Sequence, residues 1–172
     1  MRHFLTSASY YRADLLVIGP DNLPTRLTSI DPQPRATLSG FDVLTKPLQD
    51  LPLSLFGSRT LGDILFVDSS HVLVPGSDVE RLFEHILPPL PSRILVNFHD
   101  IFLLDDYPVD WTHRRYTEQT AVAGLLSTGD WQVEFSSAHA VHRLGDALAQ
   151  SVAGELPLIA GACESSLWLR KR

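Results

Sequence analysis

The chain has 172 residues, of which 44% are hydrophobic and 20% charged, and its formal net charge is −6. A chain of this size and composition can bury a core without disulfides, so we expect one domain over residues 1–172. The acidic balance argues against a nucleic-acid partner, because such partners select basic surfaces, and no apolar run reaches the roughly 18 residues of a membrane span. The lone Cys163 and a start without a signal-peptide core indicate a mature cytoplasmic protein.

Short apolar runs alternate with helix-like patterns along the first part of the chain. Helical spacing at 8–19 precedes predicted strands at 25–30 and 41–46, and a short helix is expected near 53–57. The run at 63–67 lacks polar alternation, which is typical of a strand buried on both faces.

Ser77 and Glu80 form an S-x-x-E capping box, which predicts the start of a helix. Its apolar stripe ends at the prolines that begin with Pro88. The rest of the chain predicts three strands and two helices, namely strands at 93–98, 131–135 and 166–170, a helix at 114–128 and a helix within 141–153. Strands separated by helices predict an α/β fold with a mostly parallel sheet.

Acids follow three of the predicted strands, and ligands of such sheets bind outside the carboxyl ends of the strands. Asp31 follows the strand at 25–30, Asp68 the strand at 63–67 and Asp100 the strand at 93–98. An acid in the position of Asp31 can accept hydrogen bonds from a ribose. The alternative is a turn aspartate before a proline, and the residues leave both open.

Asp68 and Asp100 are expected to lie close together, because a right-handed crossover makes their strands neighbours. Two adjacent carboxylates favour a bound cation such as Mg²⁺ or another divalent ion. His71 and His99 can add a nitrogen ligand or act as a general base. In the alternative interpretation the acids cap turns and the histidines fill polar loops.

Other features leave two interpretations each. The aromatic and acidic segment 100–111 either lines a substrate pocket or packs its loop onto the sheet edge. Glu118 and Gln119 either stabilise a helix start or point back at the site. Cys163 is more typical of a structural than of a nucleophilic residue. Neither G-x-S-x-G nor G-x-x-x-x-G-K-[ST] occurs, which argues against an α/β-hydrolase and a P-loop enzyme.

Several segments resemble the methyltransferase-24-type group of class I S-adenosylmethionine-dependent methyltransferases, in the right order and from about residue 23 onward. They are "LTSIDPQPR", "GDILFVDSSHV", "GSDV", "ILPPLPSRILVNFHDIF", "DYPVDW", "YTEQ" and "SLWLRK". The resemblance implies a Rossmann-like sheet of seven strands in the order 3-2-1-4-5-7-6. It also implies S-adenosylmethionine as cofactor, and methyl transfer to a hydroxyl of a small molecule or sugar.

The same resemblance assigns residue roles. Asp31 is the implied ribose-binding acid, and Asp68 lies beside donor and acceptor. His99 and Asp100 end the fifth strand, and in related metal-assisted enzymes acids like Asp68 and Asp100 hold a divalent cation. His71 or His99 then takes the hydroxyl proton.

The sequence departs from the family at its start. The glycine loop that approaches the cofactor is expected at 6–11, where Thr6 and Ala8 replace glycines, and only Met1 to Leu5 remain for the first strand. We therefore expect a sheet that is incomplete at the N-terminus of a shortened chain, with uncovered sheet surface available for a homo-oligomer. Two alternatives remain, a catalytically inactive remnant that serves as a binding module and a divalent-metal enzyme of another class.

Overall fold

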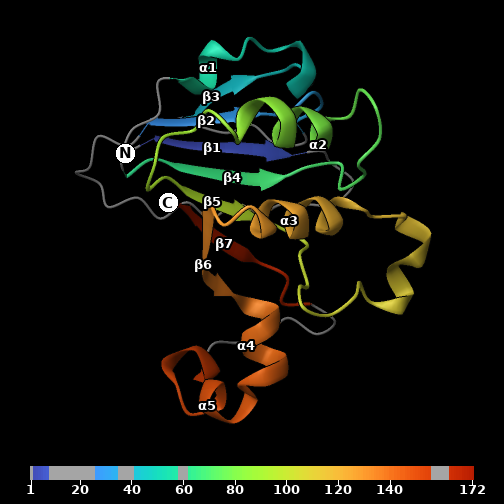
Figure 1. The fold of residues 1–172 in the computed structure, drawn as a ribbon, viewed down its shortest axis with the longest axis vertical. Coiled ribbons are helices and arrows are strands. Elements are labelled where there is room, and N and C mark those ends of the chain that lie inside the picture. The colour runs from blue at the N-terminus through green and yellow to red at the C-terminus, as the bar shows by residue number, and fades with distance from the viewer. Residues whose placement is uncertain (1, 8–25, 35–40, 58–61, 156–162) are drawn as a thin grey trace.

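The computed structural model describes residues 2–7, 26–34, 41–57, 62–155 and 163–172 (Figure 1). At its centre is a sheet of seven strands in the order β3-β2-β1-β4-β5-β7-β6. β7 is antiparallel to both of its neighbours, and the other pairs are parallel. The α/β class is as predicted, and the family resemblance implied this strand order. The strands are β1 (Arg2–Ser7), β2 (Arg26–Ile30), β3 (Phe41–Leu44), β4 (Ile64–Asp68), β5 (Leu95–Phe98), β6 (Trp131–Ser136) and β7 (Leu167–Lys171).

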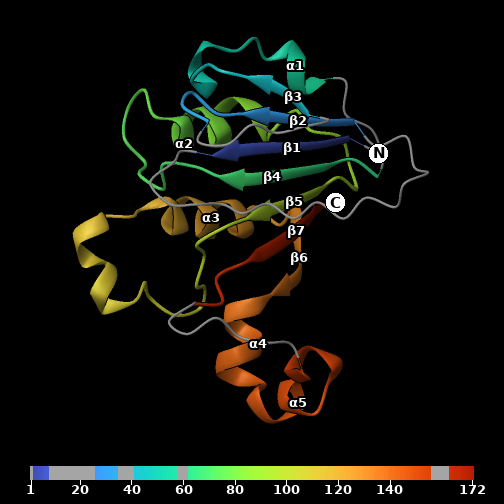
Figure 2. The same cartoon turned by 180° about the vertical axis from the view of Figure 1, so that it is seen from behind.

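From β3 onward, helical segments connect successive strands, and α2 and α3 lie on the same face of the sheet (Figures 1 and 2). The α-helices are α1 (Ser54–Gly57), α2 (Asp78–Arg81), α3 (Glu118–Ser127), α4 (Ser137–Arg143) and α5 (Gly145–Ala149). Three further segments are 3-10 helices, namely η1 (Leu48–Asp50), η3 (Val109–Arg114) and η4 (Val152–Glu155), and η2 (Leu82–Ile86) is a π-helix. None of the described helices combines the length and the apolar character of a membrane span. The helix expected at 8–19 lies outside the described residues.

The helix predicted from the capping box begins as expected. Ser77 is its N-cap, and the Ser77 hydroxyl accepts the backbone N–H of Glu80 at 3.1 Å. The Glu80 carboxylate accepts the N–H of Gly76 at 2.7 Å, one residue earlier than in a regular capping box. The far end of this helix is held by a later strand, because the Lys171 ammonium group donates to the carbonyl of Leu90 at 2.8 Å and to that of Leu87 at 3.3 Å.

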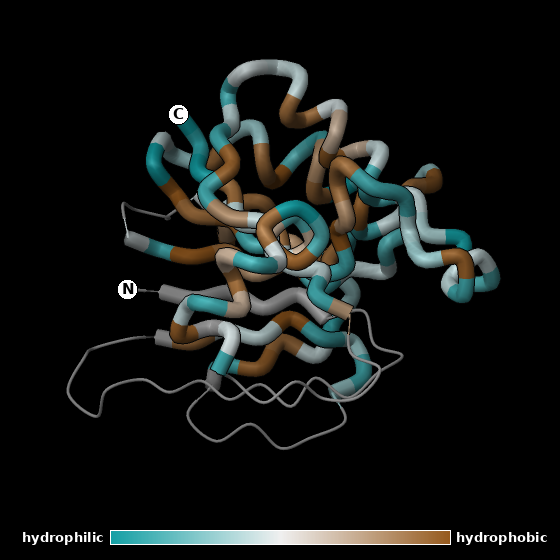
Figure 3. The backbone as a smooth tube through the Cα atoms, turned by 90° about the horizontal axis from the view of Figure 1, so that it is seen from below, coloured by the Kyte–Doolittle hydropathy of each residue, from teal (hydrophilic) through white to brown (hydrophobic). Residues whose placement is uncertain are grey.

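The core lies between the sheet and the helices on its α2/α3 face. Leu65 and Val67 of β4 are buried in this core together with Leu82 and Ile86 of η2. The intervening Ile64 and Phe66 are only half-buried, so the prediction that this strand is buried on both faces is wrong. Figure 3 shows the hydrophobic stretches gathered where strands and helices pack, and hydrophilic stretches mainly in the outer loops.

The first strand is longer than the sequence predicted. We expected Met1 to Leu5 to form it and Thr6 to begin a loop, but β1 runs to Ser7. Thr6 pairs with Ile30 of β2 and with Val67 of β4, because the parallel ladder continues to the level at which those neighbours end. Thr6 therefore belongs to the strand, and Ala8 lies outside the described residues.

Candidate functional site

Asp68 and His99 lie side by side at the carboxyl ends of β4 and β5. Val67 pairs with Phe98 in the parallel ladder, and the N–H of His99 then donates to the carbonyl of Val67 at 2.9 Å. This extra bond extends the pairing by one residue and brings the His99 ring to Asp68, with 3.7 Å between His99 Nδ1 and Asp68 Oδ1. The predicted neighbourhood of the two strand tips is confirmed.

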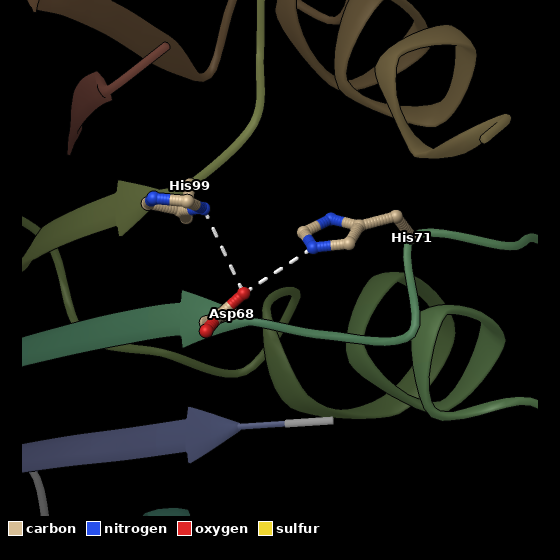
Figure 4. A group of neighbouring side chains, drawn as sticks. All are labelled: Asp68, His71 and His99. Atoms are coloured by element: carbon tan, nitrogen blue, oxygen red, sulfur yellow. Dashed lines mark ion pairs between the residues drawn. The ribbon is translucent and has the colours of Figure 1, made fainter. Parts of the chain in front are cut away.

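His71 lies at the centre of the cluster, between three carboxylates. Its Nε2 is 3.2 Å from Asp68 Oδ1 (Figure 4). The same Nε2 is 3.8 Å from Asp100 Oδ2, and Nδ1 is 2.8 Å from Glu118 Oε2. The His71 backbone has a φ of 59°, a left-handed conformation that is uncommon outside glycine. The N–H of His71 donates to Ser69 Oγ at 2.9 Å, which helps to hold this turn.

Asp100 contacts the His99 ring and is itself held by Ser165. Asp100 Oδ1 lies 3.0 Å from His99 Nδ1 and accepts the Ser165 hydroxyl at 3.0 Å. The other oxygen, Oδ2, is 3.8 Å from Arg114 Nη1. Asp100 also has a left-handed backbone, with a φ of 57°. Sequence reasoning missed Ser165 and Arg114, because nothing in their local patterns shows which strand tip they reach.

The electrostatics of the cluster favour charged imidazoles. Burial lowers the pKa of His71, but its hydrogen bonds with Asp68 and Glu118 and the charges of Glu118 and Asp100 outweigh burial and raise the pKa to about 10. The hydrogen bond with Asp100 raises the pKa of His99 against the effect of its own burial. Burial would raise the pKa of Asp100, yet the hydrogen bond and charge of His99 hold it below its ordinary value. The raised pKa favours the protonated form of His71 at neutral pH.

Glu118 resolves one of the alternatives that the sequence left open. It is fully buried in the first turn of α3 and points at His71 rather than into solvent. Burial raises the pKa of Glu118, and the hydrogen bond and charge of His71 oppose that rise. The Gln119 side chain points instead to the loop after β5, where its Oε1 accepts the N–H of Phe102 at 2.7 Å.

The aromatic residues of the β5–α3 segment pack mainly against one another. Phe102 lies edge-on to Trp111 with 5.3 Å between ring centroids, and Tyr107 lies edge-on to Tyr116 at 5.7 Å. Tyr116 also contacts His71, at 4.5 Å between ring centroids. These contacts match the packed-loop interpretation, in which the aromatic side chains fix the loop beside the cluster.

Asp31 lies in a turn that follows the end of β2. Its side chain is buried, and Oδ1 accepts the N–H of Gln33 at 2.8 Å. This bond matches the turn interpretation. Since Ile30 and Val67 pair with the same residue of β1, Asp31 lies level with Asp68 on the other side of that strand.

The strand order and the antiparallel β7 together define a Rossmann-like α/β fold, with the strand order that the methyltransferase resemblance implied. No protein-family model matches the chain, and no curated protein matches it, so the particular family remains a prediction. Among solved structures, the chain is similar to the 16S rRNA (adenine(1408)-N(1))-methyltransferase from Catenulisporales acidiphilia. The two chains are 14% identical, the match covers 86% of this chain and 76% of the other, and the TM-score is 0.35.

The expectation of no nucleic-acid partner is corrected at this point. That similar protein is named for a ribosomal RNA, which conflicts with an exclusion drawn from net charge alone. Net charge describes the whole surface and not the site, so the exclusion is withdrawn. A fold likeness at this level says nothing about which substrate this chain takes.

Proposed function

We propose that this chain is an S-adenosylmethionine-dependent methyltransferase domain that transfers the methyl group to a hydroxyl oxygen. The observation that carries the proposal is the acid and imidazole cluster at the carboxyl ends of β4 and β5, where α/β sheets bind their ligands. Asp31 and Asp68 flank β1 at one level, and two strand spacings put them roughly 10 Å apart.

On the donor side, a ribose hydroxyl would donate to Asp31, whose Oδ1 already accepts the N–H of Gln33. Asp68 would border the reacting methyl group. Thr6 and Ala8 were predicted to contact the cofactor, and with Thr6 inside β1 the approach to the donor begins where the strand ends after Ser7.

On the acceptor side, side-chain exposure divides the cluster into two layers. Asp68 and His99 are 23% and 46% exposed, whereas His71 and Asp100 are 5% and 8% exposed. The acceptor hydroxyl would therefore hydrogen-bond to Asp68, and His99 in its neutral form would take the proton at a ring nitrogen. His71 and Asp100 hold the two outer groups in place. Methyl transfer is an in-line displacement, so alignment supplies much of the rate.

The same residues are candidates for holding a divalent cation. One ligand atom from each of Asp68, His71 and His99 lies within 4.8 Å of the other two, and a bound ion would draw them to the roughly 3.0–3.5 Å that separates ligand atoms bonded at about 2.1 Å. One carboxylate with two imidazoles favours Mn²⁺, Fe²⁺ or Zn²⁺ over the Mg²⁺ that two carboxylates suggested. When bound, such an ion would lower the pKa of the acceptor hydroxyl.

Calorimetric titration of the folded chain with S-adenosylmethionine and S-adenosylhomocysteine tests the proposal. We expect both to bind, and Asp31→Ala to weaken both. A well-folded sample that binds neither would refute the proposal and favour the inactive binding module. Stabilisation by Mn²⁺ or Zn²⁺ without donor binding would instead favour a metal enzyme of another class.

The acceptor is tested second, by transfer of a labelled methyl group. Small hydroxylated molecules and sugars are the acceptors we expect, and an RNA arm is included because net charge does not exclude it. Methylation at a nitrogen or in the RNA arm alone would overturn the oxygen-directed, small-acceptor part of the proposal while leaving the donor part intact.

A further inference from the structure

Glu118 is a carboxylate with no exposed surface (0%), although it begins a helix whose neighbouring turns are open to solvent. An acid that only stabilises a helix N-terminus does not need to be fully buried, because the interaction with the helix dipole also operates at exposed positions. Burying an anion costs several kcal/mol unless it is paired. The burial of Glu118 therefore points to a specific partner, and that partner is His71, at 2.8 Å from Glu118 Oε2 to His71 Nδ1.

Residues 116–118 also hold the backbone and the ring face of His71. The carbonyl of His71 accepts the N–H of Thr117 at 2.8 Å and that of Glu118 at 3.0 Å. The Tyr116 ring lies against the imidazole, at 4.5 Å between centroids. Residues 116–118 thus hold the His71 backbone, one ring edge and one ring face. The ring nitrogen that remains, Nε2, faces Asp68 and Asp100.

We propose that Glu118 is a positioning residue, which orients the His71 ring so that Nε2 and not Nδ1 faces Asp68 and Asp100. A ring without this partner can turn about its Cβ–Cγ bond and exchange the positions of its nitrogens. The orientation of the His71 ring is inferred from the contacts of Glu118 alone, whereas the expected effect on methyl transfer rests on the proposed function. By analogy with partners that orient histidine ligands, loss of Glu118 should lower activity about 10- to 100-fold.

Gln119 provides the matched control. It is adjacent in the chain and also buried, but its contacts lead away from His71. Its side chain accepts the N–H of Phe102 at 2.7 Å and donates to the carbonyl of Asp105 at 2.8 Å. A variant at 119 therefore disturbs the start of α3 and the neighbouring loop without removing a contact of the His71 ring.

The test records ¹H–¹⁵N correlations of the imidazoles in the full chain labelled at histidine, with EDTA present and at one fixed pH. The His71 signals are those missing from His71→Asn. We expect a downfield, slowly exchanging Nδ1–H in the wild-type chain. In Glu118→Ala its solvent exchange should be at least 10-fold faster, in Glu118→Gln its signal should move upfield, and in Gln119→Ala it should remain.

Two results would overturn the proposal. One is an unchanged Nδ1–H signal in Glu118→Gln, the near-isosteric variant that serves if Glu118→Ala fails to fold. The other is an equal change in Gln119→Ala, which would show general loosening of the helix start. Titration of the same variants with S-adenosylmethionine keeps the two proposals apart, because donor binding tests the methyltransferase and the imidazole signals test the positioning of His71.

Discussion

The charged His71 makes the stability of the folded chain depend on pH in a defined direction. Its pKa rises from 6.5 to about 10 on folding, so the folded state holds a proton that the unfolded state releases. The resulting stability is complete below pH 6.5 and is lost as the pH rises through about 10. A rise of this size corresponds to at most about 5 kcal/mol.

The actual loss of stability is smaller than this upper limit, because His71 shares Asp68 and Asp100 with His99. We expect the free energy of unfolding to fall by at least about 2 kcal/mol between pH 6.5 and 9.5, which is about 4–8 °C in Tm for a chain of this length. Urea unfolding at both pH values, with EDTA present, measures it.

A matched pair of variants isolates the contribution of His71 from other groups that titrate at high pH. His71→Gln should be much less stable than the wild-type chain at pH 6.5 and nearer to it at pH 9.5. His85→Gln, at an exposed position of η2, should follow the wild-type curve. A difference between wild type and His71→Gln that stays constant or grows with pH would refute the reasoning.

The remaining predictions concern the cluster and its supports. Asp68→Asn should abolish stabilisation by Mn²⁺ or Zn²⁺ in thermal unfolding, while the wild-type chain gains at least about 2.7 kcal/mol at one hundred times the Kd; an equal gain in both would place the cation elsewhere. The methyl-transfer rate should increase as the pH rises above 6.5, because His99 accepts a proton only in its neutral form, and a flat profile in His99→Gln would support that assignment. Ser77→Ala should cost about 1 kcal/mol in urea unfolding through loss of the N-cap and leave donor binding unchanged. Lys171→Met should cost about 1–3 kcal/mol because the carbonyls of Leu87, Pro88 and Leu90 lose their donor, and an unchanged midpoint would contradict the capping role.

The strand tips were predictable from the sequence because their signals are local. An apolar run that ends in an acid identifies Asp68 and Asp100, and the crossover rule makes the two strands neighbours. His71 was predicted as part of the site, but its role as a buried imidazolium was not. That role depends on Glu118, which lies 47 positions later in the chain. Only the folded structure shows that the two residues meet.

The end of the first strand and the aromatic loop were predicted less well for the same reason. Thr6 belongs to β1 because the ladders on both sides extend to it, and pairing partners outweigh the local preference for a loop. The aromatic residues at 102 and 111 were compatible with a pocket or with packing. Their edge-on contact decides for packing, and such a contact has no periodic signal in the sequence.

The position of β7 has a consequence for the order in which the chain assembles. β7 comes last in sequence but lies between β5 and β6, so β6 reaches the sheet only through it. Until residues 167–171 have emerged from synthesis, β5 is an open edge and β6 lacks its pairing partner in the sheet. Open strand edges invite pairing with other chains. β7 thus both closes the β5 edge and joins β6 to the sheet, and the growing chain is more exposed to aggregation before β7 has emerged.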